Sequence, residues 1–257
     1  MTTKPLAGRL AAEAVGTAVL AAVLIGSGFS ASALSGDDAV RLLANVLASA
    51  LALGVLIALL APVSGAHLNP LVTAGAWWAG RRTGGPGGRE AACYALAQLA
   101  GAVAGAVLAN AMYGRPALEL SGRPRAAGHL WLGEAVATGV LVLLVLGLAR
   151  AGRERFAPVA VAGWIGAACW GTSSGSFANP ALTVGRSLSD GFTGIAPGSV
   201  PAFVLAQCAG AAVGLALVPL LFGRAAADGA DGADDADARK GRTGRTEPAA
   251  ARELPGR

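Results

Sequence analysis

The chain has 257 residues, of which 54% are hydrophobic and 14% are charged. Soluble domains carry about 25% charged residues, so this composition excludes an ordinary soluble domain and favours a protein of the lipid bilayer. The formal net charge of +5 would fit a nucleic-acid ligand. However, the arginines stand beside apolar stretches, as they do at the cytoplasmic ends of membrane helices, so no nucleic-acid partner is expected.

Six apolar stretches follow one another along the chain, each close to the ~20 residues that a helix needs to cross a membrane. The fifth is the shortest. Nothing at the N-terminus resembles a cleaved signal peptide, so the first stretch is expected to remain in the protein. We therefore predict an all-α membrane protein with transmembrane helices at about residues 10–30, 41–61, 91–112, 131–149, 157–173 and 200–222.

The basic residues indicate the orientation of these helices, because cytoplasmic flanks are enriched in Lys and Arg. One side collects Lys4, Arg9, Arg81, Arg82, Arg89, Arg150, Arg153, Arg155 and Arg224. The other side holds Arg41, Arg115, Arg123 and Arg125. We therefore expect a multi-pass protein of the cell membrane with both termini in the cytoplasm, as tails of residues 1–9 and 224–257, and an extracellular loop at residues 113–130. The second tail is polar and carries charges of both signs, so it is expected to be disordered.

The two halves of the chain, residues 10–112 and 131–223, repeat each other. EAVGTAVL at 13–20 matches EAVATGVL at 134–141, and LAQLAGA at 96–102 matches LAQCAGA at 205–211. Each half holds three crossing helices, an odd number, so the second half must enter the membrane from the opposite face. The polar residues that recur in the same order are Glu13 and Glu134, Asn69 and Asn179, Gln98 and Gln207. This pattern predicts an inverted repeat.

An Asn-Pro pair precedes a short apolar segment in each half, at Asn69-Pro70 and at Asn179-Pro180. Asn can cap a helix and Pro suits its first position. A segment of ~11 residues rises only ~16 Å, about half of the ~30 Å hydrocarbon thickness. We therefore predict two re-entrant half-helices that enter from opposite faces and meet with their N-termini at the centre of the membrane.

Such an arrangement predicts a pore, since loops at this depth are tolerated only where protein covers them or water fills a cavity. Each helix N-terminus carries about half a positive charge, which repels cations and protons. A neutral hydroxylated molecule could instead accept hydrogen bonds from the Asn69 and Asn179 amides. The residues thus indicate a passive channel for neutral solutes.

The segments GAHLNPLVT and FANPAL, the Glu of the first and fourth spans, and the LAQxxGA segments of the third and sixth resemble the major intrinsic protein family of aquaporins and glycerol facilitators. The resemblance covers residues 10 to 222. It implies an aquaporin-like fold, passage of water and small neutral solutes, and a homotetramer in which every subunit has its own pore. The implied pore signature is Asn69, Pro70, Leu71, Asn179, Pro180 and Ala181.

The chain departs from the family pattern at two positions. Leu71 stands where the family usually has Ala, so the packing of the half-helix tips is expected to adjust. Leu182 stands where the family places a filter Arg. The next arginine, Arg186, is one helical turn further along the same face; we expect it in the outer vestibule, with a return into the filter as the alternative.

Carried over by their distance from the two asparagines, the implied filter positions are Ser49, Ala167, Ser176 and Leu182. Such a filter is wide, uncharged and partly apolar, which favours glycerol-sized polyols over strict water selectivity. The run NPALTVGRSLSDGFTGIAPG also resembles a bacterial subset of the family associated with arsenic resistance. Arsenous acid is neutral at pH 7, polyhydroxylated and close to glycerol in size, so it is a second candidate solute.

The remaining polar residues are interpreted as structural. We expect Glu13 and Glu134 to accept hydrogen bonds from backbone N–H groups of the re-entrant loops, and Gln98 and Gln207 to satisfy backbone or cross-helix partners. His67 lies in the first loop without companions that could bind a metal, so it is expected to support that loop. No metal site and no cofactor are predicted.

Three further functions are alternatives to a polyol channel. An enzyme is not expected, because no catalytic triad, carboxylate pair or metal-ligand set has useful spacing. A water-selective aquaporin is the alternative within the family. A secondary active transporter can also have inverted repeats, but it generally needs a titratable group at the midplane, and Asn69 and Asn179 do not titrate.

Overall fold

The computed structural model describes residues 4–81 and 85–223. The predicted tail of residues 224–257 lies outside the described residues. Within these ranges the chain is helical and has no strand. The α-helices are α1 (Leu6–Leu34), α2 (Asp38–Ser64), α3 (Pro70–Gly80), α4 (Gly88–Met112), α5 (Gly128–Arg150), α6 (Ala157–Gly171), α7 (Pro180–Ser187) and α8 (Val200–Phe222). Two short 3-10 turns, Glu154–Phe156 and Pro197–Ser199, precede α6 and α8.

Five of these helices, α1, α2, α4, α5 and α8, are long and apolar enough to cross a membrane. They correspond to five of the six predicted spans. The fifth predicted span forms α6, which has only 15 residues and ends at Gly171. At 1.5 Å per residue it rises ~22 Å, less than the other five helices.

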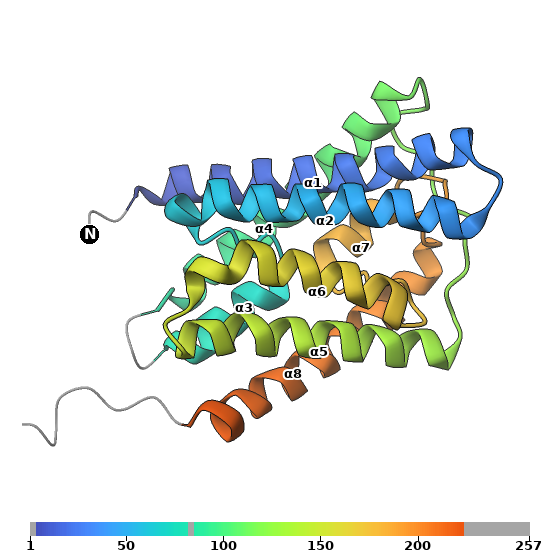
Figure 1. Cartoon of the computed structure of the whole chain (residues 1–257). Coiled ribbons are helices and arrows are strands. Elements are labelled where there is room, and N and C mark those ends of the chain that lie inside the picture. Colours follow the sequence, from blue (N-terminus) through green and yellow to red (C-terminus); the bar gives the residue numbers. More distant parts are fainter. Residues whose placement is uncertain (1–3, 82–84, 224–257) are drawn as a thin grey trace, which may run out of the picture. The chain divides into compact units, whose positions relative to one another are not determined.

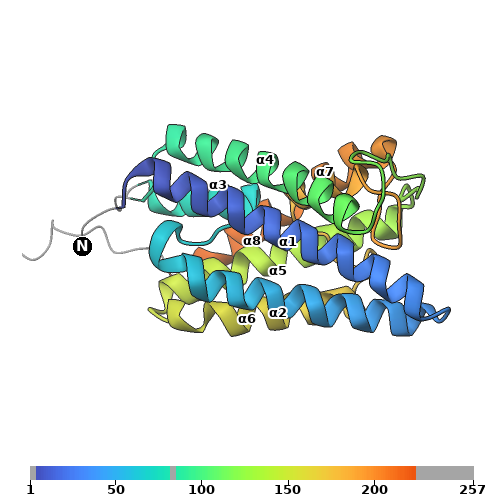
Figure 2. The same cartoon turned by 90° about the horizontal axis from the view of Figure 1, so that it is seen from above.

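The two short helices α3 and α7 lie toward opposite ends of the bundle. In both views α3 lies near the end where α1 begins, and α7 near the end where α1 finishes (Figures 1 and 2). Asn69 caps α3 and accepts a hydrogen bond from the N–H of Leu71, while Asn179 caps α7 and accepts from Ala181 and Leu182. The two predicted half-helices therefore begin where the Asn-Pro pairs place them.

The second half-helix is shorter than the ~11 residues predicted, since α7 has 8 residues and ends at Ser187. The carbonyl oxygens of Ser187 and Leu188 accept hydrogen bonds from the N–H groups of Ser121 and Glu119. These donors belong to the segment between α4 and α5. The two carbonyl oxygens are therefore not available as acceptors for a further turn of α7.

The repeat is visible in the pairing of the long helices. Helix α1 packs against α4, and in the second half α5 packs against α8. Glycines permit both crossings: a Cβ at Gly101 or Gly105 would lie 2.2 Å from a carbonyl oxygen of α1, and a Cβ at Gly210 would lie 2.0 Å from the Ala135 oxygen of α5. Each half-helix also packs on a long helix of the other half: α7 packs on α4, and α3 packs on α8.

Candidate pore

The two asparagines at the half-helix tips are joined to each other's loops. The Nδ2 of Asn69 donates to the carbonyl oxygen of Ala178 at 2.8 Å, and the Nδ2 of Asn179 donates to that of Leu68 at 2.8 Å. Both side chains are buried, and both line one internal cavity. Each amide nitrogen carries two N–H bonds, so one bond holds the opposite loop and the second remains for a molecule inside the cavity.

The loops before α3 and α7 have the same unusual backbone. Ala66 and Leu68 in the first loop, and Ser176 and Ala178 in the second, have φ between +47° and +50°. Residues other than glycine seldom adopt this left-handed region, and it costs about 1–3 kcal/mol where they do. The turns direct the carbonyls of Leu68 and Ala178 toward the opposite asparagine, so the strain is part of the contact between the halves.

A buried carboxylate holds each loop in this shape. Glu13 on α1 accepts hydrogen bonds from the N–H groups of His67 at 3.0 Å and Leu68 at 2.7 Å. In the second half, Glu134 on α5 accepts from Phe177 at 2.8 Å and Ala178 at 2.9 Å. Both glutamates are fully buried. These are the backbone donors for which the two carboxylates were expected to be the acceptors.

Each carboxylate is connected onward to a half-helix through a glutamine and a threonine. Gln98 donates to Glu13 and to Thr73, whose hydroxyl donates to the Asn69 carbonyl. The second half has the same chain of Glu134, Gln207, Thr183 and the Asn179 carbonyl. The threonines were not singled out from the sequence, although each stands four residues after its asparagine, in NPLVT and NPALT.

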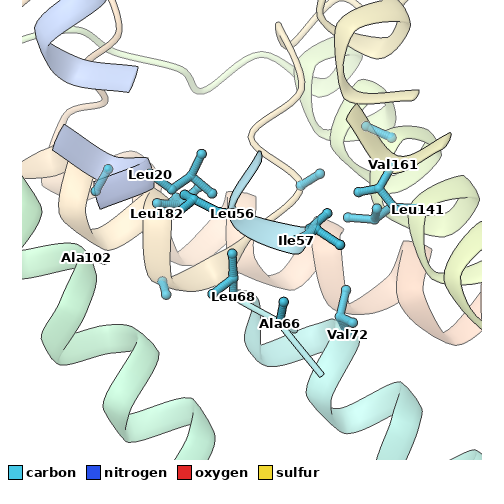
Figure 3. Close-up of a cluster of buried hydrophobic side chains, with 14 of the residues drawn as sticks. Leu20, Leu56, Ile57, Ala66, Leu68, Val72, Ala102, Leu141, Val161 and Leu182 are labelled. Carbon is cyan, nitrogen blue, oxygen red and sulfur yellow. The ribbon is translucent and has the colours of Figure 1, made fainter. Parts of the chain in front are cut away.

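The cavity beside the asparagines has a volume of about 400 Å³. One part of its wall is apolar and belongs to the buried cluster in Figure 3, where Leu20, Leu182 and Leu68 come from α1, α7 and the first loop. Loop residues 65–69 and 174–179 also line the cavity and bring polar side chains such as Asn69, Ser176 and Asn179. A solute in the cavity therefore meets both hydrogen-bonding groups and hydrocarbon.

Three of the four predicted filter positions line this cavity, namely Ser49, Ser176 and Leu182, and all three are buried. The Oγ atoms of both serines have no hydrogen-bond partner within the described part of the chain. They can therefore bond to a passing solute. Two hydroxyl groups of the cavity wall are thus available to a solute.

The prediction for Ala167 is wrong. Ala167 is exposed and does not line the cavity, whereas Val161, Ile165 and Cys169 do. These three residues are spaced by four along α6 and so share a face, from which Ala167 is turned away by about 200° relative to Ile165. The register of a span in which nearly every residue is apolar could not be set by counting from a distant asparagine.

Arg186 does not extend into an open vestibule. Only 6% of its surface is exposed, its Nε donates to the Thr193 carbonyl at 2.6 Å, and its guanidinium carbon lies 3.2 Å from the centre of the Phe177 ring. Side chains on a helix point back toward its N-terminus, and this long side chain therefore returns toward the second re-entrant loop. Of the two placements considered from the sequence, the structure has the return toward the pore.

Two residues that line the cavity near Arg186 were not predicted from the sequence. Phe177 precedes Asn179 by two residues and occupies the position of His67 in the first loop. Arg125 belongs to the segment between the repeats, where its Nε donates to Gly194 and its Nη1 to Ser174. Both line the cavity. The matched loops could have indicated Phe177, whereas only the folded chain brings Arg125 to this site.

Two predicted residues near the first half-helix, His67 and Leu71, differ in their place relative to the cavity. His67 lines the cavity and its Nδ1 lies 3.1 Å from the Thr73 hydroxyl, so the ring is joined to the half-helix that it precedes. Leu71 does not line the cavity; it packs against the cluster of Val142, Leu146 and Ala211. Its additional volume is therefore accommodated against α5 and α8.

Comparison with known proteins is decisive for the class of this pore. Residues 1–167 and 131–243 both match the family model described as major intrinsic protein. The chain belongs to the major intrinsic protein family. Membership makes the protein a multi-pass membrane channel for water and small solutes and not an enzyme.

Among relatives in the family, the aquaglyceroporin AqpS of Rhizobium meliloti (strain 1021) is 45% identical over 213 residues, covering 83% of this chain and 89% of the relative. The probable aquaporin AqpM of Archaeoglobus fulgidus is 33% identical over 221 residues, covering 75% and 87%. The aquaglyceroporin structure from Plasmodium falciparum has a TM-score of 0.64 at 22% identity and covers 84% of this chain and 97% of its own. This structural likeness supports the fold with its six spans and two re-entrant segments.

Proposed function

We propose that the protein is a passive channel whose filter admits glycerol-sized neutral polyols or arsenous acid in addition to water. The observation that carries the proposal is the place of Leu182. It follows the Asn179-Pro180-Ala181 signature directly, where the family places an arginine, and it lines the cavity with its aliphatic side chain. The relative named an aquaglyceroporin supports the same class of solute.

The proposed passage relies on the mixed polar and apolar lining of the cavity. The free N–H of each asparagine amide and the serine hydroxyls offer hydrogen bonds to solute hydroxyls, while the leucine-rich wall accepts the C–H side of a polyol. The positive N-terminal ends of α3 and α7 repel cations. No described lining residue is Asp or Glu, so nothing in this part of the chain offers a cation a negative partner.

The topology and assembly of the channel are part of the proposal. We place α7 and residues 113–130 on the extracellular side of the cell membrane and α3 and both termini in the cytoplasm, because the basic residues favour that side. The chain is proposed to divide into repeats at residues 10–112 and 131–223 and to form a homotetramer with one pore in each subunit.

Stopped-flow measurements on proteoliposomes test the solute. Water, glycerol, urea and arsenite are compared at matched osmotic gradients, with protein-free liposomes as the reference. We expect glycerol and arsenite to equilibrate far faster than in the reference vesicles. Water flux without glycerol or arsenite flux would instead identify a water-selective aquaporin.

The same vesicles separate a channel from a secondary active transporter. The fluxes are measured without any ion gradient and then with an imposed proton or sodium gradient. A passive channel should give the same solute flux in both conditions. Accumulation that depends on the gradient would overturn the proposal.

A further inference from the structure

Two guanidinium groups converge on one aromatic ring at the α7 end of the cavity. The guanidinium carbon of Arg186 lies 3.2 Å from the centre of the Phe177 ring, and that of Arg125 lies 4.8 Å from it. The two cations therefore lie no further apart than these two distances combined. We call this end of the cavity, formed by Arg125, Phe177 and Arg186, the arginine mouth.

Arg186 is a buried cation without a carboxylate partner in the part of the chain that the structure describes. Its side chain makes one hydrogen bond, from Nε to the Thr193 carbonyl, and takes part in no salt bridge. Its Nη1 and Nη2 atoms carry four more N–H donors, and the residue lines the cavity. A buried charge is costly unless it is paired, and these donors face the cavity, where water or an anionic ligand can accept hydrogen bonds from them.

The neighbouring charges leave the mouth positive. Arg125 also forms no salt bridge among the described residues, and burial followed by the charge of Arg123 lowers its pKa to about 10, which leaves it protonated at neutral pH. The nearby buried carboxylate, Glu134, already accepts from Phe177, Ala178 and Gln207. The negative charge of this one carboxylate, whose oxygens already accept three hydrogen bonds, is thus smaller than the positive charge of the two guanidinium groups.

We propose that the arginine mouth is a binding site for a small carboxylate anion, held by Arg186 and Arg125 beside the Phe177 ring. A planar carboxylate fits the fork of a guanidinium, which can donate two parallel N–H bonds to its two oxygens. No Asp or Glu lines the cavity among the described residues. The ring of Phe177 offers an apolar surface to the short hydrocarbon end of the ligand.

Thermal unfolding of the purified, full-length channel in detergent tests the site with acetate as the probe. Acetamide, which has the same shape without the charge, is the matched reference, and both are added to the same buffered sodium chloride. Because a ligand of the native state stabilises it, we expect acetate to raise Tm and acetamide to leave it unchanged. The assay requires no solute flux, so its outcome is independent of the proposed polyol passage.

Variants of the two arginines locate the effect. Arg186→Gln and Arg125→Gln should each weaken acetate binding at least about tenfold, which corresponds to ~1.4 kcal/mol. Arg186→Lys should retain part of the effect, because it keeps the charge but loses the fork. The control is Arg81→Gln, since Arg81 also stacks on an aromatic ring, 3.4 Å from Trp78, but lies just after α3.

Two results would overturn the site. One is an equal response to acetate and acetamide in the unmodified protein. The other is an acetate effect that remains unchanged when either arginine is replaced by Gln. If Arg186→Gln fails to fold, Arg125→Gln decides the question, because Arg125 belongs to a segment outside the half-helices.

Discussion

In the proposed filter Leu182 is the position to test, because an arginine there would add a third guanidinium to the region of Arg186 and Arg125. We expect Leu182→Arg to lower glycerol and arsenite flux by about tenfold or more, a barrier increase of ~1.4 kcal/mol, with a smaller effect on water. The larger polar side chain narrows the opening and removes the apolar wall. Stopped-flow light scattering on proteoliposomes measures all three fluxes.

The control for this substitution is Leu182→Met, which keeps the apolar character and nearly the volume. It should leave the ratio of glycerol to water flux close to that of the unmodified channel. If glycerol passage is unchanged in Leu182→Arg, Leu182 does not form the constriction.

Modification of Cys169 tests whether α6 lines the path of the solute. It lines the cavity, whereas Cys93 and Cys208 do not. A negatively charged methanethiosulfonate added to vesicles should therefore modify Cys169 and reduce glycerol flux, and it should react faster than a cationic reagent of similar size because the arginine mouth attracts anions. The reaction is followed as loss of flux with time.

Cys169→Ser provides the matched comparison, since it differs by one atom and cannot be modified. Its flux should be insensitive to both reagents. Modification without any effect on flux would place Cys169 outside the solute path and contradict the α6 register described above.

Single residues were predictable where a polar side chain stands alone in an apolar span. Glu13 and Gln98 could be assigned to structural hydrogen bonds because a buried polar group in a membrane requires a partner. Ala167 could not be placed, since an apolar span carries no polar residue that sets its register. Arg125 comes to the cavity only through the path of the segment between the repeats, which no local pattern specifies.

At the scale of elements, the α5–α8 crossing depends on the missing side chain of Gly210. A Cβ at this position would lie 2.0 Å from the Ala135 carbonyl oxygen, which is backbone and cannot turn away. Gly210→Ala should therefore force the helices apart and destabilise the protein by about 1–3 kcal/mol, the usual cost of overpacking. The measurement is Tm of the purified protein in detergent.

Gly163→Ala is the control for that substitution. Gly163 lies on α6, and no atom lies within 4 Å of a Cβ built there. Alanine has the higher helix propensity by about 1 kcal/mol, so this variant should be as stable as the unmodified protein or more stable. Equal loss of Tm in both variants would show that close packing at Gly210 is not the cause.

The elements themselves were largely predictable, for reasons that differ between spans and half-helices. The long spans follow from apolar length, and the starts of α3 and α7 follow from the Asn-Pro caps. The end of α7 at Ser187 was not predictable, because the segment that pairs with it lies more than 60 residues earlier in the chain. Tertiary hydrogen bonds set that boundary.

For the whole molecule, we predict that each subunit conducts independently within the proposed homotetramer. Channels are assembled from co-expressed unmodified and Leu182→Arg chains in several ratios, and glycerol flux is measured per subunit. Flux should fall in direct proportion to the fraction of Leu182→Arg chains. A steeper fall would indicate one shared path, and native mass spectrometry of the same samples would show the number of subunits.

The inverted repeat was predictable at this scale because the polar residues recur in order, and helix pairing follows it: α1 with α4, and α5 with α8. The packing of each half-helix on the other half of the chain was not predictable in detail. Contacts of α7 with α4 and of α3 with α8 depend on how the two halves interlock.

The reciprocal bonds from Asn69 and Asn179 to the opposite loop bear on regulation. Neither half of the molecule can withdraw from the centre without breaking both bonds, and each buried group left unpaired would cost about 1–3 kcal/mol. The centre of the pore is thus expected to keep a constant width. Gating would have to occur at one of the two pore entrances, where these amide hydrogen bonds do not join the two halves.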